Sequence, residues 1–125
     1  MTFEGKVFSG RGEGKRFLEL PWVRLQIQEK LGFSPYAGTL NIRLTEESIQ
    51  QLRILKSTGG ILIEPKPGYC PSLLFKAAID AVECAVVVPK VPNYPNDVLE
   101  VIAPAYLRGK LGLADGNLVA VIVTV

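Results

Sequence analysis

Histidine is absent from this 125-residue sequence, and only two cysteines are present. Without imidazole the chain has neither a His-based metal centre nor a histidine general base, so its chemistry depends on other groups. Cys70 and Cys84 lie fourteen residues apart and show no partner pattern. We expect both to be reduced thiols that pack as small apolar side chains in a cytoplasmic protein.

Long apolar runs and a strong excess of one charge are missing as well. No stretch approaches the ~20 apolar residues that span a membrane, and no signal peptide opens the chain. Fourteen basic residues against twelve acidic ones give a net charge of +2, which is too weak to indicate a nucleic-acid-binding surface. We therefore expect a cytoplasmic monomer without nucleic-acid or membrane partners.

The remaining composition describes a single globular domain, with 48% hydrophobic and 21% charged residues. Apolar periodicity and turn residues predict strands and helices along the whole chain. The predicted strands cover residues 3–8, 38–44, 61–64, 73–79, 81–88, 98–102 and 118–125, and the predicted helices cover 21–31, 46–55 and 104–111. No βαβ regularity is present, so this order favours a mainly β fold, a compact barrel of six or seven strands with short inserted helices.

A glycine-rich run follows the first predicted strand. Residues 10–14 read Gly-Arg-Gly-Glu-Gly and are followed at once by Lys15 and Arg16. Glycine permits a close approach of the backbone, so this run can lay its amides against phosphate oxygens. It is not a Walker loop, because Arg16 stands where that pattern needs Ser or Thr, and no βαβ unit supports a dinucleotide fingerprint. A flexible hairpin is the alternative interpretation.

Small polar residues also mark the strand predicted over residues 38–44. Thr39, Asn41 and Arg43 alternate with apolar residues and therefore share one face of that strand. The hydroxyl of Thr39 and the amide of Asn41 supply two neutral oxygens, which suit a hard cation such as Mg²⁺. The alternative is that this face is simply the solvent-exposed side of the strand.

Three other residues have structural as well as functional interpretations. Glu100 is either an exposed strand residue or an acidic group at a site. Asp115, followed by Gly116, is typical of a turn, and Arg108 can cap the end of a helix. Taken singly, these residues do not decide the function.

Five motifs in a fixed order nevertheless make the chain resemble the archaeal CTP-dependent riboflavin kinases. They are Gly-x-Gly-Glu-Gly-Lys at 10–15, Pro-Tyr-x-Gly-Thr-Leu-Asn at 35–41, Val-Val-Pro-Lys at 87–90, Tyr-Pro-x-Asp-Val-Leu-Glu-Val-Ile-Ala-Pro at 94–104, and Leu-Arg with Leu-x-Asp-Gly over 107–116. The likeness runs from about residue 3 to residue 123. Family members often carry an N-terminal helix-turn-helix domain, and we expect residues 1–125 to be a single kinase domain without it.

The resemblance implies a cradle-loop β-barrel related to riboflavin synthase that transfers the γ-phosphate of CTP to the 5′-hydroxyl of riboflavin, giving FMN and CDP. It also implies a Mg²⁺ ion and the roles of individual residues. On matching positions, CTP would be bound by Gly10, Arg11, Gly12, Glu13, Gly14, Lys15, Ala105, Tyr106, Leu107 and Arg108, the metal by Thr39 and Asn41, and the flavin by Pro92 and Glu100. Lys15 and Glu100 would be the catalytic residues.

One departure from the family concerns the flavin. The family usually has threonine, often followed by histidine, where this chain has Pro92 and Asn93. Proline has neither a hydroxyl nor an amide N–H, so we expect a flavin or FMN-phosphate contact to be lost or moved there. Two other functions stay open on sequence alone: a non-catalytic module that binds flavin or nucleotide, and a DNA-binding regulator of related barrel fold.

Overall fold

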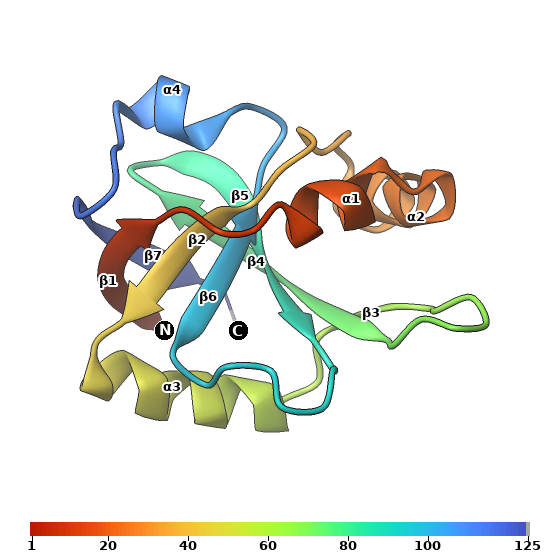
Figure 1. The fold of residues 1–125 in the computed structure, drawn as a ribbon, viewed down its shortest axis with the longest axis horizontal. Coiled ribbons are helices and arrows are strands. Elements are labelled where there is room, and N and C mark those ends of the chain that lie inside the picture. Colours follow the sequence, from red (N-terminus) through yellow and green to blue (C-terminus); the bar gives the residue numbers. More distant parts are fainter. Residues whose placement is uncertain (125) are drawn as a thin grey trace.

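The computed structural model describes residues 1–124 and is mainly β (Figure 1). Its strands are β1 (Thr2–Phe8), β2 (Leu40–Leu44), β3 (Ile61–Ile63), β4 (Ser72–Ile79), β5 (Val82–Pro89), β6 (Val98–Ile102) and β7 (Leu118–Val123), and its helices are α1 (Glu13–Glu19), α2 (Pro21–Leu31), α3 (Glu46–Ser57) and α4 (Leu107–Leu111). The strand order is β3-β4-β5-β6-β2-β1-β7, and β7 also pairs with β4. That pairing closes six antiparallel strands into a barrel and leaves β3 outside, which confirms the predicted fold class.

Alternating side chains explain the barrel. In β1 and β7 every second residue is buried, as expected of strands with one face on a core and one in solvent. The hairpin between β4 and β5 turns through Asp80 and Ala81, whose φ angles of 46° and 64° are left-handed. A two-residue turn of this kind matches the right-handed twist of the paired strands, so the predicted turn at Asp80 is confirmed.

Helix α3 lies across one end of the barrel (Figure 1). The hydroxyl of Thr45 accepts the N–H of Ser48, so the predicted N-cap is confirmed. Leu52 and Leu55 of this helix are buried in the barrel core. The hydroxyl of Ser48 in turn accepts the N–H of Glu4, which ties the helix to β1.

A second, smaller core lies outside the barrel. It consists of buried side chains from α1, α2 and the outer faces of β3 to β6: Leu18, Val23, Ile27, Ile63, Leu74, Ala85, Val87 and Ile102. Helix α2 begins at Pro21 and ends at Gly32, as predicted. Because Leu18 is fully buried here, the segment that follows the glycine run is anchored to the barrel wall.

The structure corrects three sequence predictions. The glycine run is a loop only as far as Gly12, because α1 begins at Glu13, where burial of one face of a short helix outweighs the low helix propensity of Gly14. Helix α4 begins at Leu107 rather than at 104, and the carbonyl of Ala103 accepts the N–H of Tyr36 instead of a helical partner. Strand β7 ends at Val123, and residue 125 lies outside the described residues.

Within residues 1–124, no helix is long and apolar enough to cross a membrane. Cys84 is buried, and desolvation raises the pKa of its thiol to about 12, as expected of an inert packed cysteine. Cys70 is exposed rather than packed, so that part of the cysteine prediction is wrong. Its position in the loop between β3 and β4 explains the exposure, because that loop extends beyond the core.

Candidate functional site

A cleft of about 840 Å³ opens over β2 beside the glycine run. Four stretches that are distant in sequence contribute to its walls. The lining residues are Phe8 and Ser9 where β1 ends, the run 10–15, residues 36–39 with Asn41 and Arg43, Tyr94 and Pro95 with Val98 and Glu100, and Tyr106 with Arg108. The cleft therefore collects most of the residues that the sequence singled out.

The strand register decides which side chains share the floor of the cleft. Asn41 of β2 pairs with Phe8 of β1 on one side and with Glu100 of β6 on the other. Leu40 and Ile42 are buried in the barrel, so the intervening Asn41 points outward into the cleft. The prediction that Thr39 and Asn41 lie on the face opposite the apolar residues is confirmed.

Three side-chain oxygens converge at this point. Thr39 Oγ1 lies 3.2 Å from Glu100 Oε1 and 3.4 Å from Asn41 Oδ1. A hydroxyl, an amide and a carboxylate oxygen in one cluster form a set of hard donors, the kind that Mg²⁺ accepts in proteins. In residues 1–124 no three His, Cys, Asp or Glu side chains are grouped as metal ligands, so a cation here would rely on this mixed set and on its substrate.

The glycine run packs directly on the oxygen cluster. A Cβ atom at Gly10 would lie 2.6 Å from Asn41 Nδ2, and one at Gly14 would lie 2.7 Å from Thr39 Oγ1 and 3.1 Å from Glu100 Oε1. A side chain at either position would have to displace the side chain of Asn41 or Thr39, so glycine is what lets the run lie directly on the cluster. The flexible-hairpin interpretation does not account for this close approach.

Tyr94 holds the other side of the Glu100 carboxylate. Its hydroxyl donates a hydrogen bond to Glu100 Oε2, while Thr39 lies against Oε1. Burial and the neighbouring charge of Glu100 raise the pKa of Tyr94 far above its usual value, so the phenol stays protonated and remains a donor. Both oxygens of Glu100 are thus oriented before any ligand binds.

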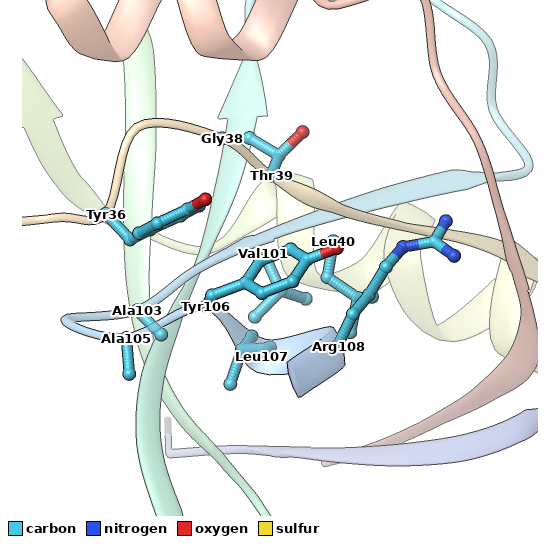
Figure 2. Close-up of a pocket in the computed structure, with 10 residues that line it drawn as sticks. All are labelled: Tyr36, Gly38, Thr39, Leu40, Val101, Ala103, Ala105, Tyr106, Leu107 and Arg108. Carbon is cyan, nitrogen blue, oxygen red and sulfur yellow. The ribbon is translucent and has the colours of Figure 1, made fainter. Parts of the chain in front are cut away.

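A smaller pocket of about 50 Å³ adjoins the cleft, and two neighbouring tyrosine rings form part of its lining (Figure 2). Tyr36 and Tyr106 face each other with ring centroids 5.2 Å apart and an interplanar angle of 34°. Ala105 and Leu107 contribute to the walls, and Arg108 extends from the same segment beside Tyr106. The pocket is therefore a small, mainly aromatic and apolar surface with one cationic neighbour, against which a flat heterocycle can pack.

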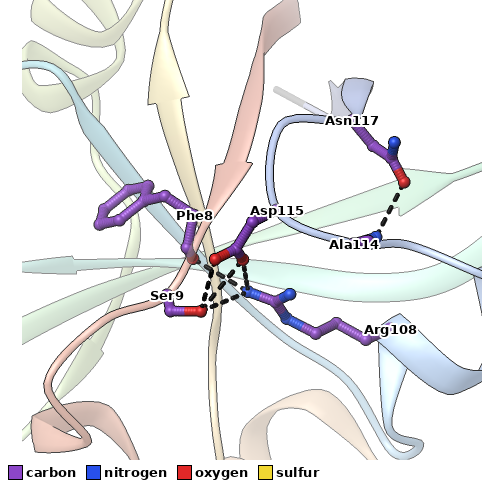
Figure 3. Close-up of polar contacts among 6 residues, drawn as sticks. All are labelled: Phe8, Ser9, Arg108, Ala114, Asp115 and Asn117. Atoms are coloured by element: carbon purple, nitrogen blue, oxygen red, sulfur yellow. Dashed lines mark hydrogen bonds and ion pairs between the residues drawn. The ribbon is translucent and has the colours of Figure 1, made fainter.

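Arg108 links this pocket to the start of the glycine run. Its guanidinium bonds to Asp115 at 2.7 Å and also reaches the carbonyl of Phe8 and the hydroxyl of Ser9 (Figure 3). Arg43 forms another ion pair at the edge of the cleft, with Asp97 at 3.0 Å. Both guanidinium groups at the cleft are thus paired with an aspartate, Arg108 beside the glycine run and Arg43 at the edge.

The structure brings together nearly all of the predicted site residues. Those on the large cleft are Gly10, Arg11, Gly12, Glu13, Gly14, Lys15, Thr39, Asn41, Glu100, Tyr106 and Arg108, and those on the small pocket also include Ala105 and Leu107. Pro92 is exposed in the loop between β5 and β6 and does not line the cleft, so its predicted flavin contact stays a prediction.

Sequence reasoning missed several residues of the site. Tyr36, Tyr94 and Asp115 gained no role, although each lies inside one of the five motifs. Ser9 and Arg43 carried a weaker signal, since Ser9 only precedes the glycine run and Arg43 only shares a strand face with Thr39. Four of them contact partners that are distant in sequence, whereas Tyr94 bonds to Glu100 only six residues away.

Comparisons with known proteins identify what the chain is similar to. A family model labelled CTP-dep_RFKase and described as domain of unknown function DUF120 matches residues 7–123. The riboflavin kinase of Archaeoglobus fulgidus is 46% identical over 125 residues, which cover 97% of this chain and 54% of that protein. The riboflavin kinase of Pyrobaculum aerophilum is 44% identical, with coverages of 94% and 58%.

A third relative has a shorter chain. The riboflavin kinase of Ignicoccus hospitalis is 39% identical over 127 residues, which cover 98% of this chain and 71% of that protein. Against the first two relatives, this chain spans little more than half of their length.

Proposed function

This chain belongs to the CTP-dependent riboflavin kinase family, and we propose that it transfers the γ-phosphate of CTP to the 5′-hydroxyl of riboflavin, giving CDP and FMN. The observation that carries the proposal is the packing of Gly10 and Gly14 on the oxygen cluster of Thr39, Asn41 and Glu100. Backbone amides for phosphate and oxygen ligands for a cation are thereby adjacent in one cleft. Phosphoryl transfer needs this combination, because it depends on positioning and charge neutralisation more than on covalent chemistry.

In this proposal CTP occupies the side of the cleft formed by the glycine run and the tyrosine pocket. The phosphates lie along residues 10–15, where the loop amides, Arg11 and Lys15 offset their charge. The cytosine ring lies against the small pocket that Tyr36 and Tyr106 line, with residues 105–108 as its wall. The preference for CTP over a purine nucleotide rests on the family to which the chain belongs.

Thr39 and Asn41 would hold the Mg²⁺ ion, and the triphosphate would complete its ligands. Bound there, the ion would neutralise charge between the β- and γ-phosphates. The nearby carboxylate of Glu100 lies against Thr39, so it adds negative charge beside the same cluster. Thr39 and Asn41 are neutral ligands and Glu100 supplies one negative charge nearby. Most of the negative charge that balances the cation would therefore come from the triphosphate of the substrate.

Riboflavin would enter from the other side of the cleft, near Tyr94, Pro95 and Val98. Glu100 is the residue placed to orient the ribityl 5′-hydroxyl and to accept its proton, because Tyr94 and Thr39 fix both of its oxygens. Lys15 would then stabilise the charge that develops on the transferred group and on the leaving CDP. Pro92 would take part only through the path of the loop, since it offers no donor.

The decisive experiment incubates the protein with riboflavin and Mg²⁺ and with CTP, ATP, GTP or UTP in parallel, and separates flavins and nucleotides by chromatography. We expect FMN and CDP in equal amounts with CTP and much slower turnover with the purine nucleotides. Chelation of the metal should abolish the reaction. Binding of CTP and riboflavin without any FMN would identify a non-catalytic module instead.

A further inference from the structure

The turn between α4 and β7 carries an aspartate that touches the beginning of the glycine run. The hydroxyl oxygen of Ser9 lies 3.0 Å and 2.9 Å from the two carboxylate oxygens of Asp115, which share its single proton in a bifurcated hydrogen bond. Asp115 also accepts a hydrogen bond from Arg108 Nη2 at 2.7 Å. Ser9 directly precedes Gly10, so an aspartate 106 residues away contacts the entry to the proposed phosphate-binding segment (Figure 3).

All of the contacts of the Arg108 guanidinium within residues 1–124 fall on one nitrogen. Nη2 reaches Asp115 Oδ1, the Phe8 carbonyl at 3.1 Å and Ser9 Oγ at 3.4 Å. A guanidinium has five N–H donors, so Nη1 and Nε keep theirs for a ligand in the cleft that Arg108 lines. The guanidinium is therefore held in place through Nη2, while Nη1 and Nε can donate to a ligand.

The backbone holds Asp115 in place independently of these side chains. The N–H of Gly116 donates to the carbonyl of Val7 at 2.8 Å, and the N–H of Val7 donates to the carbonyl of Asn117 at 2.9 Å. Asn117 also accepts the N–H of Ala114 through its side chain at 2.8 Å (Figure 3). The two residues that follow the aspartate are thus pinned to β1, and the Asn117 side chain ties the residue before it to the same turn.

We propose that Asp115 and Ser9 are positioning residues for CTP, which hold the Arg108 guanidinium and the start of the glycine run in the geometry that binds its phosphates. The inference rests on the proposed function and adds two residues to which no role was assigned. The turn identified from Asp115 and Gly116 is thereby more than a chain reversal, because it aligns a phosphate ligand.

Stability alone does not explain the network. The Asp115 side chain is 57% exposed, and exposed ion pairs contribute little to folding because solvent screens them. The hydrogen bonds from Arg108 and Ser9 hold the pKa of Asp115 below its usual value, so the carboxylate is charged at neutral pH. A charged, prealigned carboxylate serves the orientation of Arg108 more than the cohesion of the fold.

The test compares Asp115→Ala, Asp115→Asn and Ser9→Ala with the wild type by steady-state kinetics, with CTP and riboflavin varied separately, and by calorimetric binding of CDP. We expect Asp115→Ala to raise KM for CTP and Kd for CDP about tenfold, the effect of one lost charge-assisted hydrogen bond. KM for riboflavin and Tm should stay near the wild-type values. Asp115→Asn keeps an acceptor without the charge and should lie between, and Ser9→Thr, which keeps the hydroxyl, should restore the affinity that Ser9→Ala loses.

Asp97→Ala is the matched control, because it removes the other aspartate paired with an arginine at the edge of the cleft and should leave CTP and CDP affinity unchanged. Unchanged CDP affinity in Asp115→Ala would overturn the inference. So would an equal loss for both substrates together with a lower Tm, which would indicate a structural role. If the wild type bound CDP but formed no FMN, the proposed function would fail while the CDP titrations still decided the role of Asp115. Absence of CDP binding in the wild type would overturn both.

Discussion

Two arginine–aspartate pairs border the same cleft, and they differ in what they connect. Arg108 and Asp115 approach to 2.7 Å and join the end of β1, helix α4 and the turn before β7. Arg43 and Asp97 approach to 3.0 Å and join β2 to the residue just before β6, where the carbonyl of Asp97 already accepts the N–H of Leu44. The first pair adds a link from helix α4 to the end of β1 and to the turn before β7, and the second reinforces a contact that the backbone makes.

The surroundings of the two pairs reinforce this difference. The Ser9 hydroxyl bonds to Asp115, and the Phe8 carbonyl accepts a hydrogen bond from Arg108. With these two, the ion pair becomes a network of four groups. Arg43 instead lies over the Phe8 ring, 4.4 Å from its centroid, and its side chain is 53% exposed. We therefore expect the same ion-pair chemistry to serve function in one place and surface packing in the other, because the first pair joins three segments and the second joins two neighbouring strands.

The largest expected effect on activity comes from substitutions at the centre of the cleft, where neither arginine–aspartate pair makes a contact. Thr39→Val and Asn41→Leu should each lower kcat by about a hundredfold or more, because each removes an oxygen from the proposed metal site. Both pairs should survive, so the fold and the Tm should change little. Kinetics at rising Mg²⁺ concentration check the prediction, since extra metal should partly restore turnover. A wild-type kcat in both variants would contradict the metal site and would mean that Thr39 and Asn41 are ordinary solvent-exposed residues.

The next effect compares the two arginines directly. Arg108→Met should raise KM for CTP by roughly ten- to a hundredfold, since it removes a charged phosphate ligand together with the centre of the network. Arg43→Met keeps a similar apolar stem and should change KM for CTP by less than about twofold. Initial rates at saturating riboflavin measure both values. A similar rise for the two variants would contradict the division of roles between the pairs.

A smaller effect concerns the stability that the Arg43 pair supplies. A double-mutant cycle of Arg43→Met and Asp97→Asn should give a coupling free energy of about 0.2–1 kcal/mol, typical of an exposed pair. Chemical denaturation of the four proteins provides the free energies of unfolding. Salt screens exposed charges, so the coupling should fall towards zero in about 1 M NaCl. A coupling that is large or independent of salt would show that this pair is more than a surface contact.

The smallest effect is that of pH on the Arg108 network. Hydrogen bonds from Arg108 and Ser9 lower the pKa of Asp115, so the folded protein binds this proton more weakly than the unfolded chain, whose pKa is about 3.9. The stabilisation by the carboxylate is therefore present above that value and is lost only as the pH falls through the lower, folded pKa. We expect no change in the network between pH 5 and 8. NMR titration of the Asp115 carboxyl tests this, and a pKa at or above 3.8 would be inconsistent with the contacts.

Local patterns in the sequence determined most of the barrel. Alternating residues defined β1, the Asp115-Gly116 turn preceded β7, Asp80 marked the hairpin between β4 and β5, and Thr45 marked the start of α3. These features depend on neighbours a few residues away, so they can be read from periodicity and from capping chemistry. The five motifs likewise named most residues of the cleft, because each motif is a short contiguous run.

Tertiary structure alone decided α1 and the contacts that organise the site. Helix α1 carries two glycine-run residues, Glu13 and Gly14, and exists because Leu18 finds a buried place on the barrel wall. The hydrogen bond between Ser9 and Asp115 spans 106 residues, and only the register of β1 and β7 brings these two side chains together. The local sequence does not predict this hydrogen bond, because the bond depends on how the strands close the barrel.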